Sequence, residues 1–138
     1  PYVIWVPSKK HGDGQVLKAR ERIEADYAKI EAIGPIAKEA GISPRHFKRR
    51  FKQATGLLPL KYLQQIRIAS ARERLETTND PIDQITWAVG YKDVSSFCRL
   101  FRQHTNLTPG ACRARFGSSG LGKEKGWKFN SIPFYNES

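Results

Sequence analysis

The chain has 138 residues, 39% of them hydrophobic and 27% charged, and carries a formal net charge of +11. This composition is typical of a single globular domain with a modest core, and it contains no apolar run long enough to span a bilayer. The two cysteines are too few for a disulfide framework, and neither they nor the three histidines have the close spacing of a metal site. We therefore expect no metal, no cofactor and no contact with a membrane.

The first predicted element is an apolar segment at residues 1–7, followed by a polar, glycine-rich stretch at residues 8–14. The chain has no methionine, even at position 1, and we expect it to be a piece cut from a longer protein. Residues 1–14 are then a linker from an upstream domain that this chain lacks.

Helices follow in close succession, each bounded by a start or stop signal. Ser43 and Pro44 form an N-cap and first-turn pair, and Gly56 closes the helix that they begin. Asp93 is a second cap, and Asn106 can replace glycine in a left-handed C-terminal position. The sequence therefore predicts an all-α body of about seven helices. Their expected bounds are about residues 15–27, 35–41, 44–55, 60–77, 82–89, 94–106 and 109–116.

Residues 43–59 are repeated, at a distance of fifty positions, as residues 93–109. The shared residues include two phenylalanines, at positions 47 and 51 in the first copy and at 97 and 101 in the second. Both copies are basic, since residues 43–56 hold five basic residues and residues 94–116 four arginines, without a single acid. Charge gathered on the repeats, rather than spread over the chain, favours a polyanionic partner.

Each copy also shows a short helix, a tight turn with glycine and a second helix, which is the helix-turn-helix pattern. In such a pair the second helix enters the DNA major groove and the first braces it. We therefore expect a bipartite DNA-binding domain followed by a tail of uncertain structure. The expected parts are a first unit at about 15–58, a linker helix at about 60–78, a second unit at about 81–116, and the tail at 117–138.

In each second helix one face is apolar, and the other face carries the basic and polar residues that could contact DNA. Phe47, Phe51, Phe97 and Phe101 are expected to point inward. On the outer faces, the residues nearest the N-terminus and centre can reach base edges, whereas those near the C-terminus favour the phosphate backbone. The candidates for base contact are Arg45, Arg49, Ser95 and Arg99, and those for the backbone are Lys52 and Arg102. Lys48 lies on the same basic face, His46 is a phosphate contact or a surface residue, and Cys98 is a small half-buried helix residue for which a base contact stays open.

The spacing of the two copies suggests how both could act at once. A linker helix of about 18 residues spans roughly 27 Å, because each residue of an α-helix rises 1.5 Å. Successive major grooves on one face of DNA are about 34 Å apart. We therefore expect one chain to place its two second helices in adjacent grooves without dimerising.

Two other classes of function remain open at this point. A basic module of this kind could bind RNA or DNA without sequence preference, as an architectural protein does. An enzyme acting on nucleic acid would need an acid, metal or nucleophile constellation, and the sequence shows none. We expect no catalytic residue.

The sequence resembles the DNA-binding domain of AraC-type bacterial transcription regulators over about residues 15–116. The resemblance rests on IAKEAGIS, RHFKRRFKQATGLLPLKYLQQIRIASARERLETT and PIDQITWAVGYKDVSSFCRLFRQHTNLTPGACRARF. It implies a seven-helix fold whose linker helix joins two DNA-reading units. It also implies that Arg45, Arg49, Ser95, Ser96 and Arg99 face the bases.

The same resemblance implies partners beyond the DNA operator. These are RNA polymerase and an effector ligand, with sensing and dimerisation assigned to an upstream domain. The opening residues 1–17 resemble the junction found in a subgroup whose upstream domain is similar to DJ-1 and class I glutamine amidotransferases. A regulator of this family is expected in the bacterial cytoplasm, associated with the nucleoid.

Overall fold

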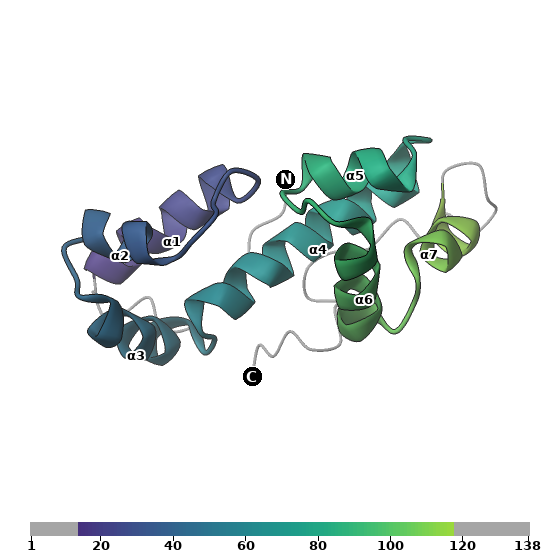
Figure 1. Ribbon diagram of the computed structural model, residues 1–138. Helices are drawn as coiled ribbons and strands as arrows, with labels where there is room; N and C mark the ends of the chain where they lie inside the picture. The colour runs from purple at the N-terminus through teal and green to yellow at the C-terminus, as the bar shows by residue number, and fades with distance from the viewer. Residues whose placement is uncertain (1–13, 118–138) are drawn as a thin grey trace. The chain divides into compact units, whose positions relative to one another are not determined.

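The computed structural model describes residues 14–117, and within this stretch the chain forms seven helices and no strand (Figure 1). The predicted all-α fold is confirmed. The linker expected at residues 1–14 and the tail at 117–138 lie almost wholly outside the described residues. The helices are α1 Gly14–Asp26, α2 Gly34–Glu39, α3 Pro44–Thr55, α4 Pro59–Thr77, α5 Ile82–Ala88, α6 Val94–Thr105 and α7 Pro109–Phe116.

The two helices that end the repeats, α3 and α6, begin and end at the residues that the sequence predicts. The Ser43 hydroxyl accepts a hydrogen bond from the backbone N–H of His46, and the Asp93 carboxylate accepts one from the N–H of Ser96. At the other ends, Gly56 has φ 89° and Asn106 has φ 65°, both in the left-handed region. Local capping chemistry is sufficient to set these boundaries.

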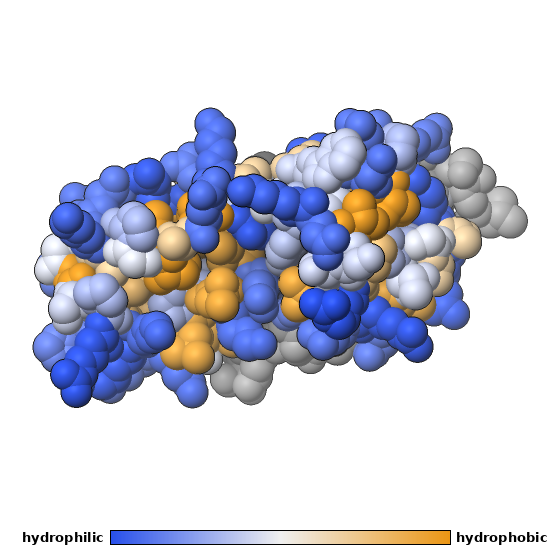
Figure 2. All heavy atoms as spheres, viewed as in Figure 1, coloured by the Kyte–Doolittle hydropathy of each residue, from blue (hydrophilic) through white to orange (hydrophobic). Residues whose placement is uncertain are grey.

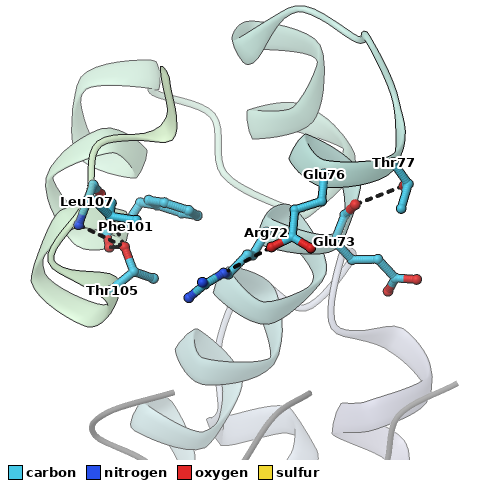
Figure 3. Close-up of polar contacts among 7 residues, drawn as sticks. All are labelled: Arg72, Glu73, Glu76, Thr77, Phe101, Thr105 and Leu107. Carbon is cyan, nitrogen blue, oxygen red and sulfur yellow. Dashed lines mark hydrogen bonds and ion pairs between the residues drawn. The ribbon is translucent and has the colours of Figure 1, made fainter. Parts of the chain in front are cut away.

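A threonine repeated in both copies closes the turn after each of these helices. The Thr55 hydroxyl donates to the Phe51 carbonyl at 2.8 Å and accepts from the N–H of Leu57 at 3.1 Å. The Thr105 hydroxyl likewise lies 2.8 Å from the Phe101 carbonyl (Figure 3). Each hydroxyl thus satisfies backbone groups at a helix end that would otherwise lack partners. This explains why threonine recurs at that position.

The described residues divide within α4 into two compact units, which we call the N-terminal unit, residues 14–66, and the C-terminal unit, residues 67–117. In the N-terminal unit α1 contacts both α2 and α3. Its core contains the rings of Phe47 and Phe51, whose centroids are 5.4 Å apart, and Tyr62 from α4 packs 5.3 Å from Phe51. Both phenylalanines are fully buried.

The C-terminal unit repeats this core with its own residues. Tyr91 packs against Phe97 at 5.8 Å, and Phe97 against Phe101 at 5.7 Å. Phe97 and Phe101 are fully buried, as the repeat predicts. Leu75 from the second half of α4 is buried in the same unit.

A cation–π contact and two hydrogen bonds to backbone carbonyls tie α7 to α4 within the C-terminal unit. Arg72 and Glu76 on α4 pair at 3.2 Å with little exposure (Figure 3), and the Arg72 guanidinium lies 5.2 Å from the centre of the Phe116 ring. Arg113 of α7 donates to the carbonyl oxygens of Leu75 and Thr78. These bonds satisfy carbonyls at the C-terminal end of α4.

Candidate nucleic-acid interface

The helix-turn-helix of the N-terminal unit consists of α2, a turn at Gly41 and α3. Gly41 has φ 80°, a conformation that residues with a Cβ rarely adopt. The N–H of the following residue, Ile42, bonds to the carbonyl of Ala37, and the Ile42 side chain is buried. The turn therefore reverses the chain tightly and lays α3 against α2.

The solvent-facing side of α3 is basic. Arg45, Lys48, Arg49 and Lys52 are all exposed, whereas the phenylalanines of the same helix are buried. Figure 2 shows the hydrophilic surface that gathers over α3 at lower left. The helix has no acid to neutralise it, so this face presents positive charge to a partner.

His46 is also exposed, but it faces the helix start rather than the basic row. Its imidazole Nδ1 lies 3.1 Å from the Ser43 hydroxyl, in addition to the capping bond of its backbone N–H. The ring therefore stands at the N-terminal end of α3, a position that suits contact with a phosphate.

Arg50 behaves differently from the other basic residues of α3. It is half-buried, and its guanidinium donates to the side-chain oxygen of Gln15 on α1 at 2.9 Å. The sequence marks Arg50 only as one member of a basic run. Its contact with α1 depends on a residue 35 positions away, which no local pattern reveals.

On α6 the predicted residues separate into a cap and an exposed row. The Ser96 hydroxyl donates to the Asp93 carboxylate at 2.6 Å, and the Ser96 N–H lies 2.8 Å from the same oxygen. These bonds hold the pKa of Asp93 below its usual value, with the charge of Arg99 adding to the effect. Ser95 and Arg99 are exposed, so these two side chains of the first turns are the ones open to a partner.

A hollow of about 630 Å³ lies beside the C-terminal half of α6. Two guanidinium groups in its wall favour an anion there, and burial raises the pKa of the Cys98 thiol, which is half-buried. Three of its residues are missing from the set predicted above: Gln103 and Asn106 continue the same face of α6 and its C-cap, and Thr108 is the N-cap of α7. The lining residues are Cys98, Arg99, Arg102, Gln103, Asn106 and Thr108.

The two cysteines of the chain are free and have no shared site. Cys112 on α7 is fully buried, and burial raises the pKa of its thiol to about 11. Between residues 14 and 117 there is no group of three or more His, Cys, Asp or Glu side chains able to hold a metal ion.

None of the helices in the described part of the chain is long and apolar enough to cross a bilayer.

Comparison with known proteins gives consistent matches. A family model described as a helix-turn-helix domain matches residues 36–115. The HTH-type transcriptional regulator Rv1931c of Mycobacterium tuberculosis is 34% identical over 84 residues, which cover 61% of this chain and 32% of that protein. The chain spans about a third of the length of the curated relatives it matches.

Solved structures extend the match to nearly the whole described region. A transcriptional regulator with an AraC-type DNA-binding domain from Chromobacterium violaceum has 32% identity and a TM-score of 0.71, covering 80% of this chain and 99% of that one. The DNA-binding domain of AdpA, solved in complex with a target DNA, has 26% identity and a TM-score of 0.70, covering 72% and 90%. The two repeated helix-turn-helix units and these matches lead to one conclusion. The chain belongs to the AraC-type helix-turn-helix family.

Proposed function

We propose that the chain is the DNA-binding part of a transcription regulator and that it reads a specific duplex sequence with α3 and α6. One observation carries the proposal: each of these helices buries a pair of phenylalanines on one face and exposes arginines on the other. Buried aromatics hold such a helix rigidly, and exposed arginines can form paired hydrogen bonds to guanine. The similarity to a DNA-binding domain solved on its target adds support.

Within α3 we assign base reading to the first turns and phosphate contact to the end. Arg45 and Arg49 are the base readers, Lys48 lies beside them, and His46 and Lys52 bind the backbone. The assignment follows from the exposure of all five side chains and from the way a recognition helix approaches the groove with its N-terminal part.

Within α6 we assign base reading to Ser95 and Arg99. Arg102 contacts the backbone, and Cys98 borders the same hollow without a chemical role. The Ser96 hydroxyl supports the cap at Asp93, so we assign Ser96 a supporting role beside these base readers. The second unit therefore carries fewer positive charges to the DNA than the first.

We further propose that one chain occupies two adjacent major grooves. The helix α4 has 19 residues and so extends about 28 Å at 1.5 Å per residue. Adjacent grooves on one face of the duplex are about 34 Å apart. Allowing for the turns at each end of α4, the match is close enough for both units to bind one DNA molecule.

The finer biology belongs to the same proposal. The chain spans about a third of its curated relatives, and we assign effector sensing and dimerisation to parts of the full protein outside it. RNA polymerase is the expected protein partner, and the bacterial cytoplasm, at the nucleoid, the expected location. We assign the chain no catalytic activity.

Selection of bound sites from a random duplex library tests the proposal. We expect two sequence blocks about one helical turn apart, with the selected duplex bound at least a thousandfold more tightly than random duplex at one fixed salt concentration, as specific DNA-binding proteins typically do. Near-equal affinity for the two would instead identify a non-specific or architectural module. A single enriched block would overturn the two-groove arrangement while leaving specific binding in place.

A further inference from the structure

A glutamine on α1 joins the three helices of the N-terminal unit through one side-chain amide. The Gln15 amide nitrogen donates to the Ala40 carbonyl at 3.0 Å and lies 3.4 Å from the Gly41 carbonyl. Its amide oxygen accepts from Arg50 at 2.9 Å. One side chain thus contacts the end of α2, the turn and the recognition helix.

The contacts at the turn satisfy backbone groups that need a partner. The last carbonyl groups of a helix find no N–H donor within the helix, and α2 has only six residues. Gln15 supplies a donor at that end. A Cβ placed on Gly41 would come within 3.2 Å of the Gln15 amide nitrogen, so the turn and the amide lie in close contact.

The amide also has a required orientation. Its NH₂ group must face the turn carbonyls and its oxygen must face the Arg50 guanidinium, because the turn offers only acceptors and the guanidinium only donors. Rotation of α3 about its axis would move Arg50 away and leave the oxygen without this partner. The arrangement therefore favours one rotational setting of α3 against α1 and α2.

The C-terminal unit holds its turn in a comparable way. Gly90 occupies the place of Gly41 and has φ 110°, and a Cβ there would lie 2.9 Å from the guanidinium carbon of Arg67. Arg67 comes from α4, the helix before the helix-turn-helix, as Gln15 comes from α1, and it lies over the Tyr91 ring at 5.1 Å. In both units a long polar side chain from the helix before the helix-turn-helix contacts the turn glycine, exposed in the case of Gln15 and buried in that of Arg67.

We propose that Gln15 is a positioning residue for sequence reading: through the turn and Arg50 it sets the orientation in which α3 presents its outer face to the bases. This inference rests on the proposed function. It concerns base contacts rather than phosphate contacts, because hydrogen bonds to base edges depend on geometry, whereas the attraction of the basic surface to the backbone tolerates small rotations.

The test compares Gln15→Ala and the double variant Gln15→Ala/Arg50→Ala with the unaltered chain and with Arg50→Ala. Gln84→Ala is the matched control, an exposed glutamine on α5 that lies outside the proposed interface. For each protein the thermal midpoint is measured, together with affinity for a selected duplex and for random duplex at one fixed salt concentration.

We expect Gln15→Ala to weaken binding to the selected duplex about tenfold, the value of one charge-assisted hydrogen bond. Affinity for random duplex should change less than about twofold, because no phosphate-binding charge is removed. In the double variant the two losses should not add, since each single change already removes the same contact. Gln84→Ala should match the unaltered chain in every measurement.

Other outcomes separate failure of the inference from failure of the function. If the unaltered chain does not distinguish the selected duplex from random DNA, the proposed function is wrong and the inference falls with it. If it does distinguish them and Gln15→Ala keeps the same ratio of affinities, Gln15 is not a positioning residue. A fall of both affinities together with the thermal midpoint would show that Gln15 only stabilises the unit, and would equally overturn the inference.

Discussion

Individual side chains on α3 show that neighbouring arginines have different surroundings. Arg49 is exposed on the outer face, while Arg50, one residue later, turns back to Gln15. A rotation of about 100° per residue along the helix is enough to separate them. The basic run of this helix is therefore not one uniform patch, and substitutions along it should differ in kind.

Replacing Arg49 should affect specificity, whereas replacing Lys52 should affect affinity alone. We expect Arg49→Ala to cost about 1–3 kcal/mol on the selected duplex and to relax base preference at one position. Lys52→Ala should weaken all sequences about equally and reduce the slope of log K against log salt by about one. Titrations at several salt concentrations measure both effects, and a uniform loss for Arg49→Ala would contradict its assignment as a base reader.

The cap of α6 should make stability depend on acid pH. Hydrogen bonds from Ser96 lower the pKa of Asp93 in the folded chain. At pH values near and between the folded and unfolded pKa of this carboxyl, the unfolded chain therefore binds more protons than the folded chain. The stabilisation is complete above the usual aspartate pKa of about 3.9, and it is lost as pH falls through the lower folded value. Asp93→Asn keeps a good capping residue but should make acid unfolding less steep.

Thermal melts followed by circular dichroism from about pH 2 to 6 would measure this change. Asp80→Asn, an exposed position in the loop before α5, is the matched control. Equal flattening in both variants would show that the effect does not come from the cap.

At the scale of whole elements, each helix-turn-helix has a turn whose glycine lies against a side chain of the helix before the motif, α1 in the first unit and α4 in the second. Gly41 lies near the amide of Gln15, an exposed side chain, while Gly90 lies near the guanidinium of Arg67, a residue that is only 8% exposed. Burial lowers the pKa of the Arg67 guanidinium, and burial of Tyr91 raises the pKa of the Tyr91 hydroxyl although the charge of Arg67 opposes that rise. The second turn therefore has less room to adjust than the first.

Gly90→Ala should be more destabilising than Gly56→Ala. Both glycines have positive φ, but a Cβ at Gly56 would meet nothing within 4 Å, whereas one at Gly90 would press on Arg67. Gly56→Ala should therefore show only the backbone strain, about 1–2 kcal/mol, and Gly90→Ala that strain together with displacement of the guanidinium. Chemical denaturation measures both, and equal losses would mean that Arg67 moves aside without cost.

At the scale of the whole molecule, two cores are built on one continuous helix. Tyr62 in the first half of α4 belongs to the N-terminal unit and Leu75 in the second half to the C-terminal unit. Because α4 is buried by different partners along its length, it does not have a single apolar stripe. Each core has its own pair of phenylalanines, so damage to one should be felt mainly in its own unit.

Phe51→Ala and Phe101→Ala should each cost on the order of 3–5 kcal/mol, since both rings are fully buried. Hydrogen exchange should rise most in α1–α3 for Phe51→Ala and most in α5–α7 for Phe101→Ala. Mass spectrometry of peptides from the two units would show this. A uniform rise in both units for either variant would mean that the chain unfolds as one cooperative body.

The sequence by itself determined the features that depend on neighbouring residues. Helix starts at Ser43 and Asp93 and stops at Gly56 and Asn106 follow from capping groups and left-handed backbone within a few positions. The spacing of the phenylalanines predicts their burial, because an inward face recurs about every 3.6 residues. The repeat also marks the two helices that expose arginine.

Only the tertiary structure decided which distant residues meet. Gln15 contacts Arg50 across 35 positions, Arg67 lies beneath Gly90, and the hollow beside α6 includes Asn106 and Thr108 from the following turn. Polar side chains of this kind have many possible partners, and hydrogen bonds between them form only where packing of the helices brings the groups within about 3 Å. Periodicity and capping carry no information on that packing. The side-chain contacts at the two turn glycines and the hollow beside α6 could therefore not be predicted from the sequence.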